Sequence, residues 1–300
     1  MTDMSSQAVA QHREHPQHPH RTVEDREIVL SASHVSFSYE KKRILHDVTL
    51  EVPQGVCMCL MGVNGCGKST FLDCILGENK ISQGDILIKG NSIRTLKPKD
   101  LASLVSYVPQ MHKRSFPYPV EHVVMMGRTV HMGLRFSPDA NDEEIVDEAL
   151  RTCGIAHLKG RPHTSLSGGE IQMVMLARAL AQQTPIVLMD EPTAHLDFKN
   201  ELLFLETVER LVVEQGVTVL MATHSPNQAF HLANGGVSTQ VAVLNHGEIA
   251  LCGSPREVLT EDMLRTIYNV DARLFECEGR TPQERMIRQI IPMHTVTKED

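Results

Sequence analysis

Three absences set the first limits on this 300-residue chain. No apolar run approaches the length of a membrane span, and the N-terminus carries no hydrophobic signal core. No Cys-x-x-Cys pair occurs among the seven cysteines, whose odd number fits free thiols in a reducing compartment. Basic residues (29 Lys and Arg) are fewer than acidic ones (37 Asp and Glu), and the net charge of −8 disfavours nucleic acid as a main partner. We therefore expect a cytoplasmic protein that binds no nucleic acid.

What the chain does contain is enough apolar material for a sizeable core, since 41% of its residues are hydrophobic. Residues 1–26 are the exception: they are polar, include "QHREHPQHPHR", and are expected to form a disordered tail. Imidazoles spaced two or three apart could bind Ni²⁺, Zn²⁺ or Cu²⁺ loosely, although a solvated linker is the favoured interpretation. The histidines concerned are His12, His15, His18 and His20.

Cys57 and Cys59 could similarly hold a soft metal, but two cysteines on one face of a buried strand are more often small core residues. That strand, in "GVCMCLMG", follows two alternating segments, "IVLSASHVSFSY" and "ILHDVTLEV", which predict an antiparallel pair. A helix is expected from Lys68 to about Leu76, and further strands in "GDILIKG" and "LVSYVPQ".

Helical patterns dominate after Gln110, and "NDEEIVDEAL" opens with an Asn-x-x-Glu capping pattern at Asn141. "IVLMDEP" and "VTVLMATH" then show no alternation, as expected of strands buried on both faces of a parallel sheet. The sequence predicts an α/β fold: a mixed sheet, an antiparallel edge, and an inserted helical subdomain over about 111–183.

The stretch "GVNGCGKST" fits the phosphate-binding pattern G-x-x-x-x-G-K-[ST] between a predicted strand and a predicted helix. Its glycines would let backbone N–H groups surround phosphates, Lys68 would reach the β and γ oxygens, and the Ser69 hydroxyl suits Mg²⁺. The alternative is a chance Gly-rich turn. The predicted nucleotide site comprises Gly62, Asn64, Gly65, Cys66, Gly67, Lys68, Ser69 and Thr70.

A second part of the site is predicted in "IVLMDEP". Asp190 lies at the end of a buried strand, where a carboxylate beside a phosphate loop can hold the metal ion. Glu191 could orient or deprotonate an attacking water. An Asp-Glu pair on a turn is more often solvated surface, but rarely directly after a buried strand.

Ser167, Gly168 and Gly169 in "LSGGE" precede a long apolar helical stretch. Uncovered N–H groups and the positive end of the helix dipole suit an anion there. An ordinary serine-capped helix after a glycine turn explains the stretch equally well.

Together, "GVNGCGKST", Gln110 in "YVPQ", "LSGGE", "IVLMDEP", "AHLD" and "MATHS" occur in the order and spacing of ATP-binding cassette (ABC) ATPases, and the resemblance covers about residues 28–275. It implies a P-loop NTPase core, ATP and Mg²⁺. It also implies that Tyr39 stacks on adenine, Gln110 is a metal and water ligand, and His224 senses the γ-phosphate. Singly, each has an ordinary structural alternative. Ser167, Gly168 and Gly169 would contact ATP bound to a second copy, so the resemblance implies a homodimer.

"FPYPVEHVVMMGRTVHMGLRF", "PTAHLDFKN" and "VLTEDMLRTIYNVDARLF" resemble the ATPases of importers for ferric siderophores, haem, cobalamin and related metal chelates. The resemblance implies two permease subunits, an extracytoplasmic binding protein, and a position on the inner face of the membrane. Residues Met126 to Arg128 resemble the permease-docking face, although a core helix ending at Gly127 is compatible with the same residues. The rival functions are a soluble ABC ATPase without permease and a metal-binding module centred on the tail.

The sequence departs from the common family pattern at three positions, Ile171, Met173 and Ser225. The ATP ligands are unaffected, so the departures bear on turnover and partner contacts. The expected domain limits are a tail at 1–26, an ABC ATPase domain at 27–275, and a C-terminal extension at 276–300.

Overall fold

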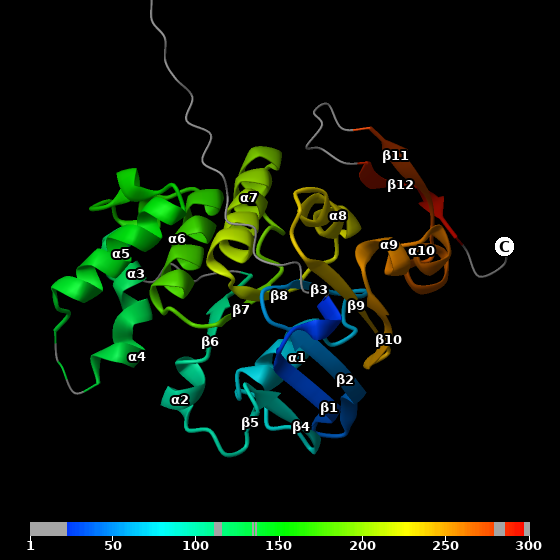
Figure 1. The fold of residues 1–300 in the computed structure, drawn as a ribbon, viewed down its shortest axis with the longest axis horizontal. Coiled ribbons are helices and arrows are strands. Elements are labelled where there is room, and N and C mark those ends of the chain that lie inside the picture. The colour runs from blue at the N-terminus through cyan, green and yellow to red at the C-terminus, as the bar shows by residue number, and fades with distance from the viewer. Residues whose placement is uncertain (1–22, 111–115, 134, 136, 279–285, 297–300) are drawn as a thin grey trace, which may run out of the picture.

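The computed structural model describes residues 23–110, 116–133, 135, 137–278 and 286–296, and within them the chain forms two main sheets, a separate hairpin and flanking helices (Figure 1). The larger sheet has the order β10-β9-β3-β8-β7-β6, with β10 antiparallel to β9 and the other pairs parallel. Its strands are β3 (Cys57–Met61), β6 (Val105–Val108), β7 (Ile186–Asp190), β8 (Thr218–Ala222), β9 (Thr239–Asn245) and β10 (Glu248–Gly253).

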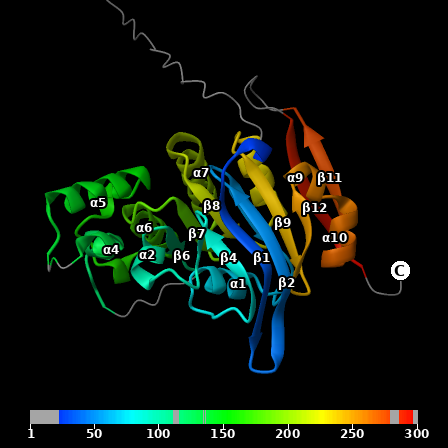
Figure 2. The ribbon, with the colours of Figure 1, turned by 60° about the horizontal axis from the view of Figure 1, so that its bottom comes forward.

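The second sheet is antiparallel and has the order β2-β1-β4-β5. Its strands are β1 (Ile28–Tyr39), β2 (Lys42–Pro53), β4 (Gln83–Ile88) and β5 (Asn91–Ser92). In Figure 2, β1 and β2 run together as a long hairpin beside the larger sheet. The predicted fold class, an α/β core with a mixed sheet and an antiparallel edge, is confirmed.

The helices are of two kinds, those that cover the larger sheet and those of the inserted segment. Around the sheet lie α1 (Lys68–Ile75), α2 (Pro98–Ala102), α7 (Phe198–Gln215), α8 (Pro226–Asn234), α9 (Pro255–Val258) and α10 (Glu261–Tyr268). The inserted segment contains α3 (Val120–Met125), α4 (Thr129–Met132), α5 (Ala140–Thr152) and α6 (Gly168–Ala181). Short 3₁₀ turns occur at Val23–Asp25, Met126–Arg128, Ala156–Leu158 and His163–Ser165.

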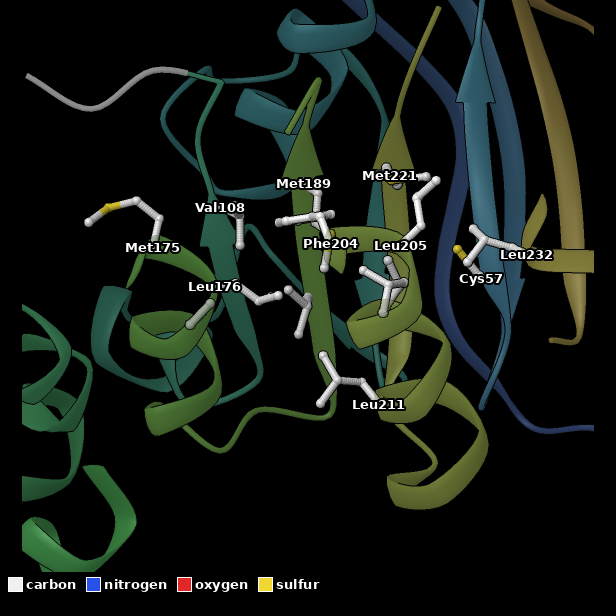
Figure 3. Packing of buried hydrophobic residues seen from close by; sticks show 14 of the residues in the cluster. Cys57, Val108, Met175, Leu176, Met189, Phe204, Leu205, Leu211, Met221 and Leu232 are labelled. Carbon is white, nitrogen blue, oxygen red and sulfur yellow. The ribbon is translucent and has the colours of Figure 1, made fainter. Parts of the chain in front are cut away.

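Strands β3, β7 and β8 of the larger sheet are buried on both faces, so alternate side chains belong to different cores. Cys57, Cys59 and Met61 face the core shared with α6, α7 and α8, which Figure 3 shows around Met189. Met58 and Leu60 face the other core, between the two sheets and α1. The interpretation of Cys57 and Cys59 as core residues is confirmed.

Three element limits differ from the sequence expectation. Helix α5 begins at Ala140, two residues before the start that a cap at Asn141 predicts, because the Asp139 carboxylate accepts from the Asp142 N–H (3.0 Å) and outcompetes the predicted cap. The expected tail is ordered at its end: Arg26 Nη1 donates to the Gly55 carbonyl (2.8 Å), whereas residues 1–22, with the four tail histidines, lie outside the described residues. The limit expected at residue 275 falls inside β11 (Val270–Cys277).

Strand β11 pairs with β12 (Ile287–Thr295), and the hairpin packs against α8. Asn227 of α8 acts as a side-chain substitute for a neighbouring strand: its amide donates to the Ile290 carbonyl (3.0 Å) and accepts from the Ile290 N–H (2.8 Å). The described part of the C-terminal extension is therefore continuous with the domain that it follows.

Arg128 corrects an expectation, because it does not lie on an exposed docking face. It is 4% exposed; its guanidinium pairs with Asp142 (3.0 Å) and donates to the Ala181 carbonyl (2.8 Å) and to Gln183 Oε1 (2.9 Å). Gly127 is equally enclosed, since a Cβ there would lie 2.2 Å from the Arg178 carbonyl oxygen. Arg128 thus joins α5 to the end of α6.

We predict that Arg128→Glu lowers the free energy of unfolding by roughly 3–5 kcal/mol, because it leaves two carboxylates facing each other in a buried site. Urea denaturation followed by circular dichroism measures the loss. The control is Lys159→Glu at the exposed pair with Asp147 (2.6 Å), where the change should stay below about 1 kcal/mol. Equal losses in the two variants would contradict the buried network.

Candidate functional site

The predicted phosphate loop lies between the end of β3 and the start of α1. Gly67 has φ 113° and precedes the helix, and no side chain caps the first turn, so its N–H groups are free of side-chain competition for an anion. Gly62 has φ 149°, and a Cβ there would lie 2.2 Å from the Leu244 carbonyl oxygen. Only glycine fits at this position.

Glu191 is the point at which the predicted catalytic residues meet. Its Oε1 lies 3.4 Å from Lys68 Nζ; its Oε2 accepts from Gln110 Nε2 at 3.4 Å and lies 3.6 Å from His224 Nδ1. Lys68 Nζ also donates to the Gly62 carbonyl (3.0 Å). Glu191 has φ 42°, a left-handed backbone conformation that is uncommon outside glycine and recurs at functional sites. Four segments distant in sequence thus place one carboxylate, two potential cations and an amide together.

Asp190 lies beside this cluster at the end of β7 and is 6% exposed. Burial raises the pKa of its carboxyl, the hydrogen bond with the Ser69 side chain opposes this shift, and Oδ1 is buried without a hydrogen-bond partner. An unpartnered carboxylate oxygen next to a hydroxyl is the hard oxygen set that Mg²⁺ binds. The residues present therefore fit a magnesium ion.

Tyr39 ends β1 with half of its surface exposed. Its hydroxyl accepts from Asn79 Nδ2 (2.9 Å), and Phe37 packs edge-on at 4.8 Å, so the ring is held from two sides. A separate hollow of about 360 Å³ adjoins the phosphate loop and is lined by the start of β2, the loop and the β9–β10 turn. Its lining includes Lys42, Arg43, His46, Asn64, Gly65, Cys66 and His246.

Ser167 caps α6, as one of the two interpretations of "LSGGE" expects. Its hydroxyl accepts from the Glu170 N–H (3.3 Å), and its own N–H donates to Glu170 Oε2 (2.8 Å). The space beside Gly169 is filled by Asn200, since a Cβ at Gly169 would lie 2.6 Å from Asn200 Cγ. At Gly168 the nearest atom to such a Cβ would be 4.0 Å away. Among the described residues, no hydrogen bond or ion pair joins these three residues to Lys68 or Glu191 of the same chain.

Met126 is the exposed member of the predicted docking face, with 47% of its surface accessible. Two adjoining hollows, of about 310 and 390 Å³, lie between α2 and the start of the inserted helices. Both are lined by Ala102, Met126, Gly127 and Gln182. Of residues 111–115, which follow Gln110, the structure gives no description.

Sequence reasoning missed a buried amide behind the site. Gln228 bonds to Thr223 (2.6 Å), Thr193 (2.7 Å) and Glu201 (2.6 Å), which belong to three different segments. The only available signal was a polar residue four positions after His224, on a face of α8 that is otherwise apolar.

We predict that Asp190→Asn stabilises the fold and disables the predicted magnesium site, because it replaces a buried, partly unpartnered carboxylate by a neutral group of the same shape. The melting temperature should rise by a few degrees, equivalent to about 1 kcal/mol. Mg²⁺-dependent ATP hydrolysis should fall by at least about a hundredfold. Asp100→Asn, on the exposed first turn of α2, is the control and should leave the melting temperature unchanged. A lower melting temperature for Asp190→Asn would contradict the prediction.

Comparisons with known proteins agree with this geometry. A family model described as "ABC transporter" matches residues 45–194. The petrobactin import ATP-binding protein FpuC of Bacillus anthracis is 35% identical over 248 residues, or 83% of this chain and 89% of that protein. The hemin import ATP-binding protein HmuV of Thermobifida fusca is 36% identical over 256 residues, or 85% and 87%.

Among solved structures, an inward-facing putative metal-chelate type ABC transporter superposes with a TM-score of 0.77 at 29% identity, covering 89% of this chain and 98% of that one. Across the described ranges, no helix has the length and apolar character that a membrane span needs. With the family model spanning half of the chain and relatives above 30% identity spanning most of it, the chain belongs to the ABC transporter family, among its ATP-binding chains.

Proposed function

We propose that this protein is the ATP-hydrolysing subunit of an importer for an iron(III) chelate, haem or a related metal complex. The observation that carries the proposal is the convergence of Lys68, Gln110 and His224 on Glu191, beside a loop whose first position, Gly62, admits only glycine. The cargo class is supported by the printed functions of FpuC and HmuV, which are petrobactin and hemin import. The cargo itself would never touch this chain.

In this proposal the loop from Gly62 to Thr70 binds the phosphates of ATP. The first-turn N–H groups of α1 and the Lys68 ammonium supply positive charge, and Tyr39 offers an aromatic face for adenine. Ser69, Asp190 and Gln110 would hold Mg²⁺, which neutralises charge on the phosphate oxygens when it is bound. Asp190 is suited to this role because its Oδ1 has no other partner.

Glu191 would orient and deprotonate the attacking water. Its carboxylate is 18% exposed, open enough for a water yet held by three neighbours. His224 lies next to this carboxylate, with Nδ1 3.6 Å from Glu191 Oε2. From there its imidazole could donate a hydrogen bond to a phosphate oxygen of bound ATP. Gln110 would link the same carboxylate to the inserted helices, because the carbonyl of the preceding Pro109 accepts from Gln172 of α6 (3.0 Å).

Ser167, Gly168 and Gly169 would contact the γ-phosphate of ATP bound to a second copy, so that ATP joins a head-to-tail homodimer. The open space at Gly168 and the exposed position of Ser167 support this arrangement. The paired hollows beside Met126 would receive a cytoplasmic segment of each of two permease subunits. A binding protein on the far side of the membrane would deliver the cargo, and the ATPase would be held at the inner face by the permease.

We predict that Lys68→Ala weakens Mg-ATP binding by at least about a hundredfold, because the phosphate charge loses its buried counter-ion. Isothermal titration calorimetry on the purified chain measures the affinity. Lys80→Ala, which removes an exposed lysine after α1, is the control and should bind like the wild type. Unchanged affinity in Lys68→Ala would reject the assignment of the phosphate loop.

We predict that Glu191→Gln forms a stable dimer with Mg-ATP, since the site keeps its shape but loses its base. Adding Gly168→Asp should abolish that dimer through repulsion between the new carboxylate and the γ-phosphate. Gly168 is the position to change because its Cβ would meet no atom closer than 4.0 Å within the chain, whereas Gly169 abuts Asn200. Light scattering measures the mass.

Asn141→Asp is the matched control for this experiment, because it adds the same charge to the exposed first turn of α5. It should leave the Glu191→Gln dimer intact. A Glu191→Gln variant that dimerises equally with ATP, with ADP and with neither would show that the contact is not built on the γ-phosphate.

A further inference from the structure

A single buried amide, that of Gln228, connects the two segments that carry Glu191 and His224. Gln228 lies on α8, four residues after His224, and is 5% exposed. Its side chain bonds to Thr223 at the end of β8, to Thr193 in the turn after β7, and to Glu201 on α7.

One charged group fixes the direction of these hydrogen bonds. An ionised Glu201 can only accept, so the Gln228 NH₂ faces Glu201 (2.6 Å) and its second N–H reaches Thr193 (2.7 Å). The Gln228 carbonyl then faces Thr223, whose hydroxyl must donate to it (2.6 Å). The Thr223 oxygen is left to accept the Ser225 N–H (3.1 Å).

This network holds the backbone on both sides of His224, because Thr223 precedes it and Ser225 follows it. Packing cannot do the same, since the His224 side chain is 56% exposed. The opposite end of the network is Thr193, two residues after Glu191, whose own N–H bonds to the Ala222 carbonyl (3.0 Å).

Helix α8 is also fixed from outside. Asn227, next to Gln228, makes two hydrogen bonds with Ile290 of the C-terminal hairpin (3.0 and 2.8 Å), and Asn234 donates to the Arg288 carbonyl (3.3 Å). The amide of Gln228 therefore projects from a helix that the hairpin keeps in place.

We infer that Gln228 is a positioning residue for ATP hydrolysis, setting the distance between His224 and Glu191 through Thr223 and Thr193. The inference rests on the proposed function, because it assigns His224 and Glu191 to one reaction. Gln228 touches neither of them directly. Its role is exerted through the threonine hydroxyls on either side.

The first test replaces Gln228 by leucine in the full chain. Gln228→Leu should lower kcat about tenfold and leave KM for ATP within about twofold, because the phosphate loop and Tyr39 are untouched while the His224 segment loses its tether. Assays run well below the melting temperature of each variant. Thr207→Val is the control: this buried threonine donates only within its own helix, to the Leu203 carbonyl (2.8 Å), and kcat should stay near the wild-type value.

The second test exchanges donor and acceptor. Gln228→Glu alone would place two carboxylates about 2.6 Å apart and should lower kcat more than tenfold. Glu201→Gln combined with Gln228→Glu restores every bond, since the new amide donates to the new carboxylate and both threonine hydroxyls can donate to it. The double variant should recover kcat to within about threefold of the wild type. Failure of the exchange to recover activity above Gln228→Glu would overturn the inference.

The third test separates positioning from general support of the fold. In a His224→Ala background, measured by single-turnover hydrolysis with enzyme in excess, Gln228→Leu should cause no further loss. A loss as large as in the wild type would show that Gln228 does not act through His224. Hydrogen exchange gives a readout without hydrolysis: the Ser225 amide should exchange at least about tenfold faster in Gln228→Leu, and unchanged protection overturns the inference. A wild-type chain that hydrolyses no ATP would instead reject the proposed function.

Discussion

Parallel pairing of β3, β8 and β7 is the constraint on which the site depends. Leu60 is in register with Ala222, and Ala222 with Asp190, so the three strands end level at one edge of the sheet. The phosphate loop, the Asp190-Glu191 turn and the His224 segment all leave from that edge. A one-residue slip of a strand buried on both faces would move each side chain from one core to the other. The packing of Cys59 and Leu60 on opposite sides therefore also fixes the positions of the proposed catalytic groups.

The same edge concentrates groups that are costly to bury. Lys68 is 5% exposed and Asp190 6% exposed, and they lie with Glu191 in a small volume where burial already raises the pKa of Asp190. The left-handed backbone at Glu191 adds local strain. A fold of this size tolerates such a cluster because two apolar cores lie on either side of the sheet that carries it.

Features of the fold and the site that depend on neighbouring residues could be predicted from the sequence, whereas those that depend on contacts between distant segments could not. The phosphate loop and the Asp190-Glu191 pair were predictable because each lies in a local strand-turn pattern with its own residue requirements. Arg128 was misjudged because its partners, Asp142, Ala181 and Gln183, come from segments 14 to 55 residues away. Helix α5 began early because a local competitor, Asp139, was available.

Gln228 and the C-terminal hairpin escaped prediction for a related reason. An isolated glutamine on a helix carries no periodic signal, and its value comes only from Thr193, Glu201 and Thr223 converging in space. The hairpin depends on Asn227 satisfying the backbone of Ile290, a pairing across 63 residues with no counterpart in local sequence. The family resemblance supplied roles for exposed residues such as Tyr39 and Ser167, which geometry within one chain leaves as proposals.

Ser167 caps helix α6 with a hydroxyl, although other side chains could cap the same helix. Aspartate and asparagine cap helices as well as serine does. The serine oxygen accepts the Glu170 N–H, and the Ser167 N–H and hydroxyl both hydrogen-bond to the Glu170 carboxylate, which lowers the pKa of that carboxyl. A phosphate oxygen that approached Ser167 would therefore compete with Glu170 for the hydroxyl hydrogen. An aspartate could accept the same N–H, but it would place a second carboxylate beside Glu170 and repel an anion. Of the residues that can begin this helix, serine is one that adds no charge and carries a hydrogen that Glu170 and an incoming anion would share or contest.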